Sequence, residues 1–122
     1  MALLESGEMY LETILVLASR GKTVRAIDIS EYMGFSKPSV SRALSRLRAE
    51  GYVTVSETGA IAFTETGRTV AEKIYARHTL LSELLEQIGV DPDTAREDAC
   101  RIEHDISDET FAALKRYVRS HE

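Results

Sequence analysis

Apolar residues recur at helical spacing through the first third of the chain, and glycines interrupt the pattern. The segment 3–19 carries a broad apolar stripe and stops before Gly21, which predicts a first helix. A second helix is predicted over 24–33, with Thr23 as its N-cap and Gly34 at its end. Two helices, each followed by a glycine, therefore open the chain.

A third helix is predicted directly after the second. Ser36 is a suitable N-cap, Pro38 lies in the first turn where its missing N–H costs nothing, and Gly51 closes the helix. Its core-facing residues follow the spacing i, i+4, i+7: Val40, Leu44 and Leu47. The residues on the other faces are mainly serines and arginines, so this helix presents a polar and basic surface.

The pattern changes after residue 51. Two short β-favouring runs, 52–55 and 61–63, flank the turn sequence "SETGA" and predict one hairpin. A long helix is predicted over 65–88, with Thr64 as its N-cap. Two further helices are predicted, one that begins at Asp91 and Pro92 and one that Ser107 caps. The fold class is therefore mainly α with a small β-hairpin.

The order of these elements predicts two domains. Two short helices joined by a tight glycine-containing turn and followed by a hairpin are typical of a winged helix-turn-helix DNA-binding domain, here residues 1–70. Residues 71–122 then form an all-helical domain. A DNA-binding module this short usually works as a dimer, because two half-sites double the phosphate contacts. We therefore expect a homodimer and assign the helical domain to dimerisation.

The charge distribution supports a DNA-binding first domain. The net charge is −5, but residues 1–70 carry eight basic and eight acidic residues, whereas 71–122 carry seven and twelve. Residues 37–48 hold four basic residues and no acidic one. Taken alone, this helix could be an ordinary solvated face; its place in the element order favours DNA. The candidate DNA-binding residues are Arg25, Ser36, Lys37, Pro38, Ser39, Ser41, Arg42 and Arg46.

Several other classes of protein are disfavoured by the sequence. No apolar run approaches the roughly 18 residues of a membrane span. The N-terminus "MALLESGEMYLETI" lacks a basic segment and so does not resemble a signal peptide. A single cysteine cannot form an internal disulfide. We expect a cytoplasmic protein that does not bind a membrane.

The acidic second domain contains a motif that could bind metal. In "DACRIEHDISD" the thiol of Cys100, the carboxylate of Glu103 and the imidazole of His104 follow the spacing i, i+3, i+4, so a helix would present them on one face. The alternative is that Cys100 packs as a small apolar residue while the other two lie at the surface.

Three residues elsewhere strengthen the metal hypothesis. His78 lies in the middle of the long predicted helix, and Met9 and Glu12 lie one turn apart on the first helix. Sulfur and imidazole ligands suit borderline or soft divalent metals, and carboxylates admit Fe²⁺ and Mn²⁺. Ligands drawn from both halves of the chain would let metal binding set the arrangement of the DNA-reading domains.

The sequence resembles the diphtheria toxin repressor family of metal-dependent transcriptional repressors, which includes iron-dependent and manganese transport regulators. The stretches that carry the resemblance are "EMYLETI", "FSKPSVSRALSRL", "FTETGR", "RHTLLSELLEQIGV" and "DACRIEHDISD". The resemblance implies a winged helix followed by an all-helical dimerisation domain, in a short form without the SH3-like domain of larger members. It also implies a homodimer that binds double-stranded operator DNA when Fe²⁺ or Mn²⁺ is bound.

The ligand set implied by the resemblance combines two types of member. The iron-type activating site is matched by Met9, Cys100, Glu103 and His104, and the neighbouring site of manganese-type members by Glu12 and His78. The ancillary site of larger iron-type members is not matched, because its acidic and histidine positions are Ser82 and Arg96. Ligand softness favours Fe²⁺, with Mn²⁺ as the alternative. Co²⁺, Ni²⁺ or Zn²⁺ would substitute in vitro.

We therefore expect a metal-dependent DNA-binding transcriptional repressor that controls metal homeostasis genes, with no enzymatic activity and no small organic substrate. One alternative is a winged-helix redox regulator that uses Cys100 as its switch. Another is a small metallohydrolase with Glu103 as base, but that function would leave the basic third helix unused.

Overall fold

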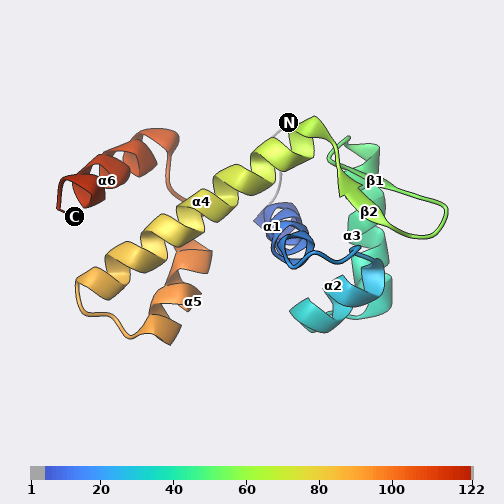
Figure 1. Cartoon of the computed structure of the whole chain (residues 1–122), viewed down its shortest axis with the longest axis horizontal. Coiled ribbons are helices and arrows are strands. Elements are labelled where there is room, and N and C mark those ends of the chain that lie inside the picture. Colours follow the sequence, from blue (N-terminus) through green and yellow to red (C-terminus); the bar gives the residue numbers. More distant parts are fainter. Residues whose placement is uncertain (1–4, 122) are drawn as a thin grey trace. The chain divides into compact units, whose positions relative to one another are not determined.

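The computed structural model describes residues 5–121, and the chain divides into two compact units, one that ends at Glu72 and one that begins at Lys73. The predicted start of the first helix, residues 3 and 4, lies outside the described range. The described residues form six helices and one hairpin, in the order that the sequence predicts. These elements are labelled in Figure 1. The predicted fold class is confirmed.

The first unit is built from three helices and the hairpin. Helices α1 (Glu5–Ser19), α2 (Ala26–Met33) and α3 (Lys37–Ala49) enclose one apolar core, to which the hairpin also contributes. The largest fully buried side chains of this core are Leu11, Ile14, Ile29, Val40, Leu47 and Val53. The apolar positions of α3 face this core, as the sequence predicts, and their burial holds the helix in place.

Helix α2 starts later than the sequence predicts. Its N-cap is Arg25 and not Thr23, and the Arg25 backbone N–H is held by the Asp28 carboxylate at 2.9 Å. The reason lies in Val24, whose carbonyl accepts a hydrogen bond from the Ile61 N–H at 2.8 Å. Val24 is therefore extended and pairs with the hairpin, so the helix cannot include it.

The hairpin and the start of α4 are joined by a close backbone contact. Strands β1 (Val53–Val55) and β2 (Ile61–Phe63) pair antiparallel. The Thr64 hydroxyl donates to the Gly51 carbonyl at 2.6 Å and accepts from the Gly67 N–H, so it caps α4 (Glu65–Gln87) as predicted. A Cβ at Gly67 would lie 1.8 Å from the Tyr52 carbonyl oxygen. Only glycine allows this approach.

The second unit contains the remainder of α4, α5 (Pro92–Ile102) and α6 (Asp108–Ser120). Asp91 caps α5 and Ser107 caps α6, both through side-chain oxygens that accept backbone N–H groups. The buried apolar residues are Ile74 and Leu81 of α4, Ala95 and Ala99 of α5, and Val118 of α6. None of the described helices is long and apolar enough to cross a membrane.

Candidate metal centre and nucleic-acid interface

Three predicted metal ligands meet in the second unit. His78 projects from the middle of α4, Cys100 from the last turn of α5, and Glu103 from the residue that caps α5. Their ligand atoms all lie within 4.8 Å of one another. The predicted helical face is slightly modified, because α5 ends at Ile102 and His104 lies in the following turn.

One nitrogen of His78 lies close to both the carboxylate of Glu103 and the sulfur of Cys100. Nδ1 of His78 lies 3.0 Å from Oε2 of Glu103 and 3.6 Å from Sγ of Cys100. Nε2 of His104 lies 3.4 Å from Oε1 of Glu103. One imidazole nitrogen has a single proton and cannot donate fully to both a carboxylate and a sulfur. A cation among the ligand atoms of His78, Cys100 and Glu103 would be shared by these three side chains.

Burial of Glu103 makes the cluster a good fit for a metal. This side chain has 0% exposure, and its Oε1 accepts no hydrogen bond among the described residues. A buried carboxylate is costly unless paired or coordinated to a metal. The donors are a thiol, a carboxylate and two imidazoles, a set that suits borderline divalent metals. The alternative with Glu103 and His104 at the surface is wrong, because the His104 side chain is also only 2% exposed.

The electrostatics of the cluster favour a bound positive charge. The pKa of His78 is raised from 6.5 to about 10. The largest cause is the hydrogen-bonding contact with Cys100, the contact with Glu103 adds to it, and burial acts in the opposite direction. In the metal-free protein the His78 imidazole is therefore protonated at neutral pH and carries a positive charge. A bound metal ion would supply positive charge in place of this proton.

The remaining two predicted ligands belong to the first unit. Met9 and Glu12 lie one turn apart on α1. Met9 is 38% exposed, whereas its neighbours Tyr10 and Leu11 are buried in the core of the first unit. Its participation in a metal site stays a prediction, as does that of Glu12.

One residue that contacts this cluster was missed by the sequence reasoning. Arg77 precedes His78 on α4, is buried, and donates hydrogen bonds to the backbone of the turn that carries Glu103 and His104. The available signal was its position between apolar helix residues, directly beside a candidate ligand. A single arginine on a helix is more often a solvated residue, so the pattern alone did not select it.

All predicted DNA-binding residues except Arg25 lie on α3 or at its N-cap. Ser36 caps the helix, and its hydroxyl donates to Oγ of Ser39 at 2.9 Å. Ser39 is half-buried, while the other predicted residues on this helix are exposed: Lys37, Pro38, Ser41, Arg42 and Arg46. The exposed N-terminal turns of a second helix in a helix-turn-helix are the part that enters the major groove.

Arg25 takes a different position from the α3 residues. It lies before α2, and its Nε donates to the Thr58 carbonyl in the hairpin turn at 3.3 Å. Arg25 also borders a hollow of about 370 Å³ between α2, α3 and the hairpin, together with Ser41, Ser45 and Arg48. Apolar side chains, among them Ile27 and Leu44, form much of the rest of the lining, and the basic and hydroxyl side chains are the ones suited to contact a phosphate backbone. Ser45 and Arg48 join the candidate set on this ground.

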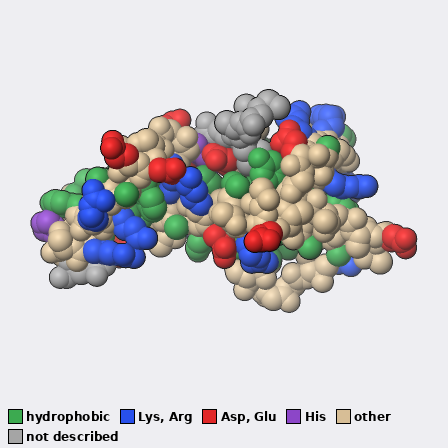
Figure 2. All heavy atoms as spheres, turned by 90° about the horizontal axis from the view of Figure 1, so that it is seen from above, with side chains coloured by type: hydrophobic (Ala, Val, Ile, Leu, Met, Phe, Trp, Pro, Cys, Tyr) green, Lys and Arg blue, Asp and Glu red, His purple; other side chains and the backbone are tan. Residues whose placement is uncertain are grey.

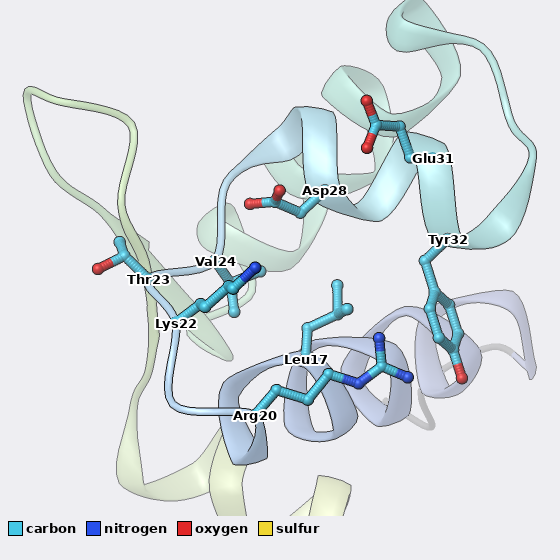
Figure 3. A pocket seen from close by; sticks show the side chains of 8 residues that line it. All are labelled: Leu17, Arg20, Lys22, Thr23, Val24, Asp28, Glu31 and Tyr32. Carbon is cyan, nitrogen blue, oxygen red and sulfur yellow. The ribbon is translucent and has the colours of Figure 1, made fainter.

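A second hollow, of about 330 Å³, lies between the end of α1 and α2. Figure 3 shows Arg20 and Lys22 on one side and Asp28 and Glu31 of α2 on the other, with Arg20 extending toward Tyr32. The Arg20 guanidinium lies 5.4 Å from the Tyr32 ring centroid. Charges of both signs line this hollow, so a polyanion would gain little there.

The surface in Figure 2 carries acidic and basic side chains interspersed. The net charge of −5 therefore does not produce a uniformly acidic surface on the face shown. A local basic helix such as α3 can remain available for a polyanion in a protein of this composition.

Family models match both parts of the chain. Residues 2–61 match the N-terminal DNA-binding domain of the iron-dependent repressors, and residues 64–122 match their metal-binding and dimerisation domain. The transcriptional regulator MntR of Escherichia coli is 30% identical over 92% of this chain and 72% of its own length. The chain belongs to the iron-dependent repressor family.

Two further comparisons place the chain within this family of metal-dependent transcriptional repressors. The diphtheria toxin repressor of Corynebacterium diphtheriae is 36% identical over 96% of this chain. The chain spans about half of that relative, 52% of its length. The structure of the manganese regulator SloR superposes with a TM-score of 0.82 at 27% identity, over 98% of this chain and 55% of SloR. The predicted resemblance is confirmed.

The alternative of a redox regulator finds no support. The matched C-terminal model is a metal-binding and dimerisation domain, and Cys100 lies among His78 and Glu103, which a thiol switch would not require. The matched family models are described as iron-dependent repressors, whereas SloR is a manganese regulator, so the comparisons leave the metal open between the two.

Proposed function

We propose that this protein is a metal-activated, homodimeric transcriptional repressor that binds double-stranded operator DNA of metal homeostasis genes. The observation that carries the proposal is the fully buried Glu103 carboxylate, surrounded by Cys100, His78 and His104, in a chain that also carries an exposed basic α3. These two features would be independent in an ordinary DNA-binding protein. A metal-activated repressor needs both.

The proposed metal ligands are His78, Cys100, Glu103 and His104 from the second unit, completed by Met9 and Glu12 from α1. A bound divalent cation supplies positive charge that lets a carboxylate, a thiolate and imidazoles occupy one site. Glu103 would hold the cation through its buried carboxylate, and Cys100 would bind it as the thiolate. Ligands from α1 would order the first unit, because α1 belongs to the core that supports α3.

Fe²⁺ is the proposed physiological effector, with Mn²⁺ as the alternative. The cysteine and methionine sulfurs are softer donors than carboxylates, and soft donors favour Fe²⁺ over Mn²⁺. Raw affinity does not decide the matter, because Co²⁺, Ni²⁺ and Zn²⁺ bind such sites more tightly in vitro. Control of iron homeostasis genes follows as part of the proposal.

For DNA binding, the exposed N-terminal turns of α3 supply the base and phosphate contacts. Arg42 and Arg46 are long enough to form bidentate bonds with guanine or phosphate, and Lys37 contacts phosphate. The hydroxyls of Ser36, Ser39 and Ser41 allow close approach to the backbone. Arg25 binds phosphate beside the hairpin, which acts as the wing.

The test is anaerobic fluorescence anisotropy on a labelled duplex enriched by the wild-type protein from a random-sequence pool in the presence of Fe²⁺. We expect binding with Fe²⁺ or Mn²⁺ and its loss in chelator. Glu103→Ala removes the buried carboxylate and should abolish the metal response. The matched control is Asp105→Asn, an exposed acidic residue in the same turn, which should respond like the wild type.

Tight DNA binding in chelator, unchanged by metal, would contradict the proposal. So would a Glu103→Ala protein that keeps the full metal response while its circular dichroism matches that of the wild type. Sedimentation equilibrium of the metal-loaded protein should give a dimer, and a monomer at the concentration that saturates DNA would exclude the homodimeric form.

A further inference from the structure

Arg77 is a buried cation whose charged end is directed at backbone carbonyls. Its side chain is only 7% exposed. Nη1 donates to the carbonyl oxygens of Glu103 at 3.0 Å and Ile106 at 2.7 Å, and Nη2 contacts Oδ1 of Asp108 at 2.5 Å. The guanidinium carbon lies 5.5 Å from the Phe111 ring centroid. Four groups from one segment of chain therefore fix this side chain.

The segment that Arg77 holds is the turn between α5 and α6. Glu103 caps α5, and the turn continues through His104 and Ile106 to the start of α6. Two residues in this turn, Glu103 and His104, carry proposed ligand side chains. The adjacent residue on α4 is His78, a third proposed ligand. Arg77 thus fixes the distance between the backbone of α4 and the backbone that carries Glu103.

The position could also be explained by general electrostatics. A cation at the C-terminal end of α5 interacts favourably with the carbonyls that the helix leaves unpaired. Electrostatics alone makes a clear prediction about metal binding, however. A fixed positive charge near a site for a divalent cation weakens that site, so removal of Arg77 would strengthen metal binding. If Arg77 instead orients the ligands, its removal would weaken metal binding.

We propose that Arg77 is a positioning residue for the metal centre, which sets Glu103 and His104 against His78 by clamping the α5–α6 turn. This inference rests on the proposed metal site. Nη1 donates to both carbonyls while Nη2 contacts the carboxylate, so the arrangement uses two nitrogens held in the plane of the guanidinium. An ammonium group has a single nitrogen and cannot reproduce it. Lys73 also contacts Asp108, at 2.8 Å, but its side chain is about half exposed. Among the described residues, the side chain that donates to the Glu103 and Ile106 carbonyls is that of Arg77.

The experiment is an anaerobic titration of the whole chain with Co²⁺, followed by its d–d absorption bands, which report the geometry and number of ligands. Arg77→Met removes all donors and retains a side chain of similar length. Arg77→Lys retains the charge and a single donor nitrogen. Lys73→Met is the matched control, because it removes a cation from Asp108 without touching Glu103 or Ile106. Circular dichroism and metal-free melting curves accompany each protein.

We expect Arg77→Met to bind Co²⁺ about 10- to 100-fold more weakly, as for other residues that orient metal ligands, with altered d–d bands. Arg77→Lys should show altered bands and weaker binding despite its retained charge. Lys73→Met should match the wild type in both respects. A residue that served only stability would lower the metal-free melting temperature and leave the bands of the saturated protein unchanged.

Two results would overturn the inference. One is wild-type affinity and wild-type bands in Arg77→Lys, or in a folded Arg77→Met. The other is tighter Co²⁺ binding by Arg77→Met, which would assign Arg77 a purely electrostatic effect. Should Arg77→Met not fold, Arg77→Lys decides by the same criteria. Absence of Co²⁺ binding by the wild type would instead overturn the proposed function, and this inference with it.

Discussion

At the scale of single residues, Glu103 is the acidic side chain that is buried among the described residues, and burial of its charge is costly without a nearby cation. It is a carboxylate with 0% exposure, and the groups nearest to it are titratable side chains rather than backbone donors. A buried carboxylate retains its charge only when an opposite charge is present. In the metal-free protein that charge comes from the proton on His78, whose pKa is raised to about 10 by Cys100 and Glu103.

The raised pKa of His78 predicts a strong pH dependence of metal binding. Below a pH of about 10 the imidazole is protonated in the metal-free protein, and a metal must displace this proton. The apparent affinity should therefore rise with pH through the neutral range, by about tenfold per pH unit for each proton released. Isothermal calorimetry in buffers of different ionisation enthalpy would count the protons.

For this prediction the control is His78→Gln, which cannot hold the proton and should show a weaker pH dependence along with weaker binding. The range from pH 6 to pH 8 lies about two to four units below the shifted pKa of His78. Metal affinity of the wild type that stays constant over this range would show that the metal does not displace the His78 proton.

The choice between iron and manganese should depend on the two sulfur residues. Replacing Cys100 by Glu and Met9 by Asp exchanges soft donors for carboxylates, which suit the harder Mn²⁺. We expect the double variant to require less Mn²⁺, relative to Fe²⁺, for half-maximal DNA binding. Anaerobic anisotropy with each metal gives this ratio. An unchanged ratio would show that donor softness does not set the preference.

At the level of elements, α3 is the proposed DNA-reading helix, and its arginines should contribute through charge. Arg42→Ala and Arg46→Ala should each weaken DNA binding. Each lost phosphate contact should also reduce the slope of log affinity against log salt by about 0.9. Arg116→Ala on α6, also an exposed arginine, is the matched control. Unchanged slopes for both α3 variants would argue against phosphate contacts from this helix.

The elements themselves were largely predictable, because their end signals are local. Ser36, Thr64 and Ser107 cap helices in the structure as the sequence predicts. The start of α2 was not predictable from local signals. Thr23 is an acceptable cap, but pairing of Val24 with Ile61, a contact across 37 residues of sequence, keeps that segment extended. Tertiary pairing overrides a local preference there.

The candidate site was predictable in residue type but less so in geometry. The spacing of Cys100, Glu103 and His104 indicated a common face, whereas the structure ends α5 at Ile102 and places His104 in a turn. That turn is fixed by Arg77, from a helix that precedes it by about 26 residues. Such long-range support leaves no periodic signal in the sequence, which is why Arg77 was missed.

At the level of the whole molecule, the central claim is that metal binding and DNA binding are coupled. We assign the two activities to different units of one chain. In the iron-dependent repressor family the N-terminal domain is a DNA-binding domain and the C-terminal domain a metal-binding and dimerisation domain. Coupling between two sites is reciprocal: the factor by which metal strengthens DNA binding must equal the factor by which DNA strengthens metal binding.

The coupling between metal binding and DNA binding is tested most directly by the Mn²⁺ affinity of the whole chain. Anaerobic calorimetry gives this affinity with and without a saturating amount of the enriched duplex. We predict tighter Mn²⁺ binding in the presence of DNA, by the same factor that anisotropy gives for DNA binding with and without Mn²⁺. A scrambled duplex should give a smaller factor. Equal Mn²⁺ affinities with and without the enriched duplex would contradict the account.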